Sequence, residues 1–283
     1  MLGAVFGLDH HGCHTRSALR MIQTMKRSEA GLSAQFRRYF EVIRADSEEL
    51  REAVFRIRYE VYCTEMGYED PARFPDGMEH DEYDRRARHV LLRHRPSGTY
   101  AGCVRLIQDT GSEPRELFPF ERFGGQSLRR NIIDPARLPR NSFGEISRLA
   151  VRGQFRRRSG EQAVPHGVAS EDPVEYSAEQ RRIIPHIALG LYLAAAAMGL
   201  LQGLSGVFVM MEPRLARHMR RYGIVFRQAG EIVEYHGQRG PFYISRRALF
   251  EHLRPEIREL LDAITEDLEG RHPAGSERSC NAP

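Results

Sequence analysis

The chain has 283 residues, 41% of them hydrophobic and 28% charged, which is typical of a soluble globular protein with one or at most two domains. A net charge of +4 does not require a nucleic-acid partner, and it fits an acidic protein or an anionic ligand equally well. The four cysteines lack metal-ligand spacing and no secretory signal is evident, so we expect free thiols, a cytoplasmic location and no metal site.

An irregular N-terminal extension over residues 1–37, which could end in a short helix, is expected to precede a strand at residues 40–44. Asp46 and Glu49 form a capping-box pattern for a helix that runs to about residue 64. Its core face carries Leu50, Val54, Ile57 and Val61, and the neighbouring face carries Arg51, Phe55, Arg58 and Tyr62. The second face is either two solvated arginines lying over aromatic rings or a cationic wall that faces an acidic cluster or ligand.

An acidic segment follows, with Glu79, Asp81, Glu82 and Asp84 within six residues. It leads into a strand at residues 87–92, a turn at 96–98 and a second strand at 99–107. Arg105 shares a face of the second strand with Cys103 and Ile107, which are core residues. Because an unpaired buried guanidinium costs several kcal/mol, Arg105 is expected to pair with a carboxylate.

The strand predicted over residues 143–151 is unusual because it carries both an acid and a base. Glu145 and Arg148 would point to opposite faces of a regular strand, whereas a one-residue bulge would bring them to the same face. A bulge would unite these two residues with Arg51, Arg105, Glu79, Asp81 and Asp84 in one charge network. Such a network favours a role in ligand orientation or proton transfer, although purely structural networks also exist.

Residues 187–211 contain no charge and are numerous enough to cross a bilayer. Interspersed glycines and a change of composition instead predict a buried helix over residues 183–202 and a core strand over 206–211. We therefore expect no transmembrane segment and leave peripheral membrane contact open. Glu212–Pro213 begins a helix that Gly223 ends. Three strands follow at 224–228, 231–236 and 241–245, then one or two helices to about residue 268 and a disordered tail over 269–283.

Four motifs follow the order and spacing of the acyl-homoserine-lactone (autoinducer) synthase superfamily. They are Arg51-x-x-x-Phe55, Glu79-x-Asp81-x-Tyr83-Asp84, Gly102-x-Val104-Arg105-Leu106 and Glu145-Ile146-Ser147-Arg148. The chain resembles in particular the acyltransferases associated with the PEP-CTERM/exosortase system and the N-acyl amino acid synthases. The resemblance implies one GNAT-like (acyl-CoA N-acyltransferase) α/β/α sandwich over residues 38–268, with a mixed, mostly antiparallel sheet. It also adds Phe55 and Ser147 to the expected substrate-binding network.

Two departures from the family pattern concern the acceptor. Typical autoinducer synthases carry Trp after the first helix and again before the Glu-x-Ser-Arg strand, whereas this chain has no Trp and has Phe143-Gly144 at the second place. The segment that follows the strand is also longer. Both departures argue against S-adenosylmethionine as the acceptor. Synthesis of an acyl-homoserine lactone from S-adenosylmethionine is therefore kept only as an alternative function.

A basic loop after the charged strand is the candidate site for the acyl carrier. Arg156, Arg157, Arg158 and Gly160 stand where acetyltransferases bind the CoA pyrophosphate at a helix start. The match is partial because Gln162 replaces a small residue. The phosphopantetheine phosphate or the acidic surface of acyl carrier protein fits equally well, and a solvated loop is the plain alternative. Residues 161–180 read as a mobile insertion that could act as a lid.

The resemblance implies transfer of a fatty acyl group from a thioester, on acyl carrier protein or CoA, to the amine of an amino acid or related small molecule. No permanently bound cofactor is expected. Glu145 is the first candidate to take the proton of the ammonium, and Glu79 the second. Asp81 and Asp84 would position the ammonium, while Arg105 and Arg148 would hold the network or the acceptor's carboxylate. The acyl chain would lie in an apolar tunnel lined from residues 183–211. A non-catalytic protein that binds acyl lipid or nucleic acid is the remaining alternative.

Overall fold

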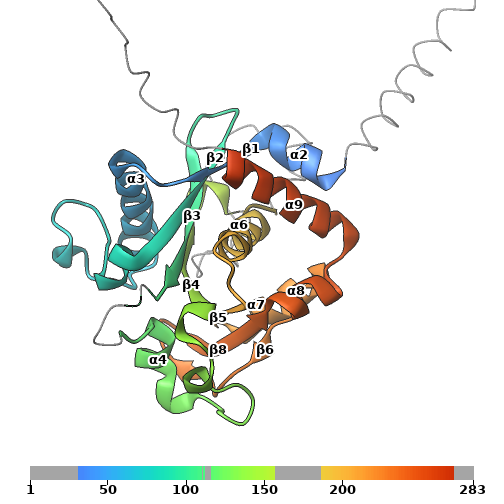
Figure 1. Ribbon diagram of the computed structural model, residues 1–283. Helices are drawn as coiled ribbons and strands as arrows, with labels where there is room; N and C mark the ends of the chain where they lie inside the picture. The colour runs from blue at the N-terminus through green and yellow to red at the C-terminus, as the bar shows by residue number, and fades with distance from the viewer. Residues whose placement is uncertain (1–30, 110, 112–115, 157–185, 271–283) are drawn as a thin grey trace, which may run out of the picture.

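A mixed β-sheet forms the centre of the computed structural model, which describes residues 31–109, 111, 116–156 and 186–270 (Figure 1). The strand order is β1–β2–β3–β4–β5–β8–β6, and β7 pairs with β8. The strands are β1 Phe40–Arg44, β2 Ala87–His94, β3 Tyr100–Gln108, β4 Phe143–Val151, β5 Gly206–Met211, β6 Arg227–Gln228, β7 Val233–Glu234 and β8 Gln238–Ser245. Among these strands β4 and β5 form the one parallel pair, so the sheet is mostly antiparallel, as predicted.

Helices cover both faces of the sheet, which completes the predicted α/β/α sandwich. Figure 1 shows α3 on one face, and α6, α9 and α2 on the other. The helices are α2 Leu32–Tyr39, α3 Glu48–Arg58, α4 Pro119–Gly124, α6 Ile187–Leu201, α7 Pro213–Met219, α8 Arg246–His252 and α9 Pro255–Gly270. The main apolar core lies between the sheet and α6 with α9, and a smaller cluster lies under α3.

The uncharged segment at residues 187–211 is a buried helix followed by a core strand, as the sequence predicted. Leu191, Leu193 and Ala195 of α6 are fully buried, and Gly203 turns the chain toward β5 with a φ of 69°. Within the ranges that the structure describes, no helix combines the length and apolarity needed to cross a bilayer.

Residues 32–39 form helix α2, a short helix directly before β1, and its Phe36 packs against Gly190 of α6. One expectation near the N-terminus was wrong. The cap of α3 is Ser47, whose Oγ accepts a hydrogen bond from the backbone N–H of Leu50 at 3.3 Å. The predicted cap Asp46 pairs with Arg44 at 2.8 Å instead. Past residue 58 the chain continues as a π-helix over Tyr59–Glu65, so the predicted length of this helical segment is confirmed.

Candidate active site

Strand β4 contains the predicted bulge. Arg105 of β3 lies opposite Ser147, but Cys103 lies opposite Ala150, so β4 carries one extra residue between these two pairs. The extra residue adopts a left-handed backbone at Arg148, with a φ of 49°. As a result Glu145, Ser147 and Arg148 all line one cavity, while Ile146 and Leu149 belong to the core cluster of the opposite face.

Tyr62, on the π-helix, holds the bulge in place. Its hydroxyl donates a hydrogen bond to the backbone carbonyl of Leu149 at 2.9 Å. The guanidinium carbon of Arg148 lies 5.5 Å from the centroid of the Tyr62 ring, within the range of a cation–π contact. The sequence placed Tyr62 on the aromatic and cationic face of its helix, but sequence analysis assigned it no contact with the charged strand.

The helix contributes Arg58 to the charge network, and not the predicted Arg51. Arg58 is fully buried; it pairs with Glu79, and its Nη1 donates to Asp84 at 2.7 Å. Arg51 is exposed near the start of α3, where it donates to the backbone carbonyl of Asp46. Both arginines belong to the same helical face, but the late position, two turns further along, is the one that reaches the acidic segment.

Arg105 is buried and paired with two carboxylates of the protein. Arg105 is 1% exposed, and its Nη1 lies 2.5 Å from Asp81 and 2.8 Å from Asp84. Its Nε donates to Oγ of Ser147 at 3.0 Å. The predicted need of Arg105 for a carboxylate is thereby confirmed.

Arg148 is the meeting point of three carboxylates. It lies 3.0 Å from Glu69, 3.1 Å from Glu79 and 3.5 Å from Asp81. Glu69 was not among the predicted residues. It belongs to a loop after the π-helix, and its sequence neighbours gave no signal of burial.

The two aspartates are held by their own backbone as well as by arginines. Asp81 caps the 3₁₀ turn Glu82–Arg86 by accepting a hydrogen bond from the N–H of Tyr83 at 2.9 Å. Asp84 accepts one from the N–H of Asp81 at 2.8 Å, which completes a capping box. The charges of Arg58 and Arg105 hold the pKa of Asp84 well below its ordinary value, against the opposing effect of burial. Phe55 does not line the cavity; it packs between His80 and His89.

The two candidate bases have opposite environments. Glu145 is 1% exposed and lies opposite Phe208 of β5, and its Oε2 accepts a hydrogen bond from the N–H of Phe120 at 2.9 Å. Burial raises the pKa of Glu145 to about 8. Burial would also raise the pKa of Glu79, but the charges of Arg58 and Arg148 lower it to about 2. Glu145 is therefore the carboxyl that exchanges a proton near neutral pH.

Three neighbouring cavities surround β4. The charged cavity, of about 380 Å³, contains Glu145, Ser147 and Arg148 in its wall. A narrow gap of about 50 Å³ opens where the pairing of β4 with β5 ends, beyond Ile146 and Val209. The gap shares Tyr62, Ser147, Arg148, Met210 and Arg239 with the charged cavity.

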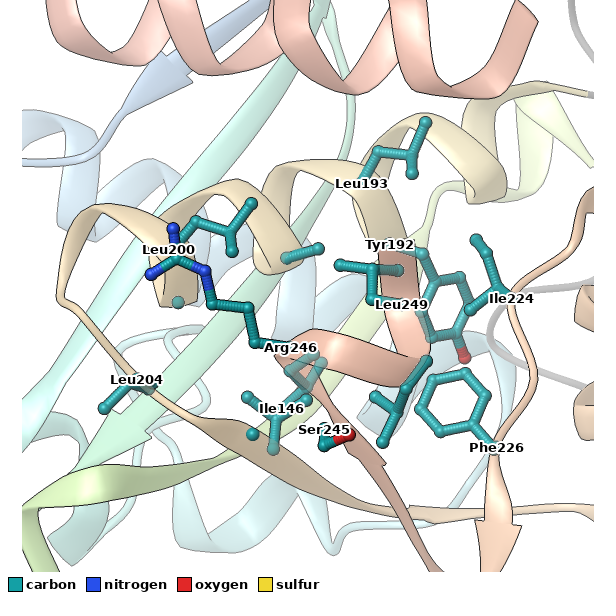
Figure 2. Close-up of a pocket in the computed structure, with 15 residues that line it drawn as sticks. Ile146, Tyr192, Leu193, Leu200, Leu204, Ile224, Phe226, Ser245, Arg246 and Leu249 are labelled. Carbon is teal, nitrogen blue, oxygen red and sulfur yellow. The ribbon is translucent and has the colours of Figure 1, made fainter. Parts of the chain in front are cut away.

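An apolar cavity of about 40 Å³ lies on the α6 side of the sheet (Figure 2). Figure 2 shows Tyr192, Leu193 and Leu200 of α6 on one side of this cavity and the aromatic ring of Phe226 on another. The cavity shares Ile146 and Tyr192 with the gap between β4 and β5. The lining residues between positions 192 and 207 belong to the segment that was expected to line an acyl tunnel.

The predicted carrier-binding loop is described only at its first residue. Arg156 is 4% exposed and paired with Glu65, and burial lowers its pKa, so it is a buried ion-pair partner and not part of an exposed patch. Arg157, Arg158, Gly160 and the insertion over residues 161–180 lie outside the described residues. Among the residues that are described, no cluster of side chains has the makeup of a metal site.

The fold resembles that of known proteins. Residues 57–165 match the family model of the acetyltransferase (GNAT) domain. The fold is similar to that of BjaI, a CoA-dependent acyl-homoserine lactone synthase solved with SAM and isopentyl-CoA, at TM-score 0.50 and 20% identity over 80% of this chain and 89% of that chain. FeeM, an N-acyl amino acid synthase from uncultured soil microbes, gives a TM-score of 0.47 and 12% identity over 76% and 94% of the two chains. No match was found among curated proteins. The fold is therefore GNAT-like, and the protein is an acyl-transferring enzyme.

Proposed function

We propose that this enzyme transfers a fatty acyl group from a thioester to the amine of an amino acid or a closely related small molecule. The observation that carries the proposal is Glu145, a buried carboxyl with a pKa of about 8 in the wall of a charged cavity. An amine arrives as ammonium and must lose a proton before it can attack. A carboxylate with this raised pKa is a far better proton acceptor than an ordinary one.

The reaction needs little beyond positioning and the removal of two protons from the acceptor nitrogen. The amine nitrogen attacks the carbonyl carbon of the thioester, the C–N bond forms, and the C–S bond breaks. Glu145 takes one proton of the ammonium before the attack, and the nitrogen loses a second proton as the amide forms. One of these two protons goes to the departing thiolate and the other to solvent, so that an amide and a free thiol are released. Strands β4 and β5 separate beyond Ile146 and Val209, which leaves room beside the bulge for backbone N–H groups to face the oxyanion.

The arrangement of the cavities suggests the path of the donor. The gap between β4 and β5 shares lining residues with the charged cavity on one face of the sheet and with the apolar cavity on the other. We place the thioester at the gap and the acyl chain in the apolar cavity, where its methylenes contact α6. Burial of each methylene there stabilises the bound donor by about 0.8 kcal/mol.

Three finer assignments belong to the same proposal. Acyl carrier protein is our preferred donor over free CoA, supported by the adjacent basic residues Arg157 and Arg158 of the sequence. The four sequence motifs support kinship with PEP-CTERM/exosortase-associated acyltransferases. Cysteines without metal or disulfide spacing support a reducing, cytoplasmic location.

The test is direct assay of the purified protein with acyl-CoA and acyl carrier protein donors of graded chain length and a mixture of the twenty amino acids, read by mass spectrometry. We expect an N-acyl amino acid as product. Glu145→Gln should abolish its formation while the variant stays folded, because Gln can still accept the hydrogen bond from Phe120. An acyl-homoserine lactone formed only with S-adenosylmethionine would overturn the acceptor, and wild-type turnover by the variant would overturn the role of Glu145.

A further inference from the structure

The charged cavity is lined by five arginines, and four of them are already paired. Arg105 and Arg148 bind the carboxylates of the buried network. Arg73 pairs with Glu69 and Arg122 with Glu82. Each of these four therefore already has a carboxylate partner within the protein.

Arg239 is different. It lines both the charged cavity and the gap between β4 and β5, yet no carboxylate among the described residues lies within ion-pairing distance of it. Its Nε is buried and has no hydrogen-bond partner in that part of the chain. The guanidinium carbon lies 5.6 Å from the centroid of the Tyr68 ring, another residue of the cavity wall, within the range of a cation–π contact.

Among the carboxyls that line the charged cavity, one likewise has no ion-pair partner in the described part of the chain. Glu69, Glu79, Asp81 and Glu82 are all ion-paired with arginine. Glu145 forms no ion pair with any described residue, and its Oε2 is held by a backbone N–H of α4. One cation and one carboxyl of the cavity are therefore left over, and they have opposite charge when both are ionised.

We infer that Arg239 binds the carboxylate of the acceptor and that the acceptor is a free, zwitterionic amino acid. This inference rests on the proposed function, because it places the ammonium of the acceptor at Glu145. A guanidinium with an unsatisfied Nε–H offers a carboxylate the two parallel hydrogen bonds of a bidentate pair. The zwitterion supplies the two charges that the protein leaves unmatched, so that every charged group of the cavity is paired when it binds.

The donor's phosphate is the other anion that reaches an acyltransferase site. In a phosphopantetheine thioester the phosphate stands at the far end of the arm from the reacting carbonyl. A guanidinium that shares a cavity wall with Glu145 is therefore placed to meet the acceptor and not the phosphate.

The experiment compares each amino acid that the enzyme acylates with its amide, which keeps the amine and lacks the carboxylate. For wild type we expect kcat/KM to favour the free acid by about tenfold or more, the size of a hydrogen-bonded charge pair. Arg239→Gln should raise KM for the free acid by that factor, change kcat little, and leave the amide unaffected. Arg239→Lys should restore part of the preference. Arg73→Gln removes a cation from the rim of the same cavity and should keep the preference for the free acid.

Calorimetric titration of the same amino acids without donor separates this inference from the proposed function. Arg239-dependent binding by a protein that acylates no amine would uphold the carboxylate site and reject the proposed reaction. Acylation of amides as efficiently as of free acids by wild type would overturn the inference while leaving acyl transfer in place. An unchanged acid preference in Arg239→Gln would overturn it as well, and so would the absence of any binding.

Discussion

Glu145 and Glu79 show how residues of one type in one site are given different properties by their neighbours. Both carboxyls are 1% exposed. Glu79 lies between two guanidiniums, which keep it ionised, whereas Glu145 lies opposite Phe208 and accepts one backbone hydrogen bond. Because the paired carboxylate is fixed in its charged form, the unpaired one is left to exchange protons.

The pH dependence of catalysis follows from the pKa of about 8 that burial gives Glu145. The active form is the carboxylate, so kcat/KM should rise about tenfold per pH unit below pH 8 and level off above it. Steady-state rates measured from pH 5.5 to 9.5 check this. A rate that is flat between pH 6 and 8 would contradict it.

Protein stability provides a control that does not depend on activity. An unfolded chain releases the Glu145 proton near pH 4.5, whereas the folded protein keeps it up to about pH 8. The folded state thus binds more protons in this window, and wild-type stability should fall from pH 4.5 to 8 relative to Glu145→Gln. Urea unfolding of both proteins across this range measures the difference.

At the scale of elements, the bulge of β4 does two jobs at once. It turns Arg148 toward the same cavity as Glu145, and it keeps Leu149 in the core on the α6 side. A regular strand would exchange these two side chains, which would bury a guanidinium among leucines. The π-helical turn before it matters equally, since it carries Tyr62 to the Leu149 carbonyl.

The left-handed backbone conformation of Arg148 can be tested separately from the charge of its side chain. Arg148→Ala and Arg148→Gly both lose the ion pairs, but only Gly adopts a φ of 49° without steric cost. We expect the Gly variant to be more stable than the Ala variant by about 1 kcal/mol in urea unfolding.

Ser147 offers the matched comparison for this test. It precedes Arg148 on the same strand and has no left-handed backbone. Glycine in an ordinary strand is less favourable than alanine, so Ser147→Gly should be less stable than Ser147→Ala. If the Ala variant were more stable than the Gly variant at position 148 as well as at position 147, the strained conformation of Arg148 would be ruled out.

At the scale of the whole molecule, the sheet separates a polar chamber from an apolar one. The network lies on the α3 side, the apolar cavity lies on the α6 side, and the gap between β4 and β5 shares lining residues with both cavities. Helix α6 is apolar on nearly every face because it is enclosed by the sheet and by α9. An amphiphilic donor suits this division, with its reactive group on one side and its chain on the other.

Filling the apolar chamber should shorten the acyl chain that the enzyme accepts. Ala196 of α6 is half-buried and lines that cavity, so Ala196→Phe should lower kcat/KM for long-chain donors by about tenfold or more and leave short-chain donors unaffected. Competition between donors of graded length measures the preference.

Ala216 of α7 is the control for this change. It is likewise half-buried against the main core but does not line the cavity, so Ala216→Phe should keep the chain-length preference of wild type. An unchanged preference in Ala196→Phe would remove the acyl chain from this chamber.

The amino-acid sequence by itself determined the sandwich fold, the order of its elements and the pairing of Arg105 with the acidic segment. These features follow from periodicity and from the cost of burying an unpaired charge, which are local properties of the chain. The bulge was predicted for the same reason, since Glu145 and Arg148 could not otherwise face one site.

Only the tertiary structure decided which arginines serve the network and which one is left over. Arg51 and Arg58 stand on one helical face, and the sequence cannot show which turn of the helix meets the acidic segment. Glu69 and Arg239 come from a loop and from the start of β8, neither of which has a periodicity that marks burial. Their roles arise from contacts between segments about 80 or more residues apart, which depend on packing and not on local pattern.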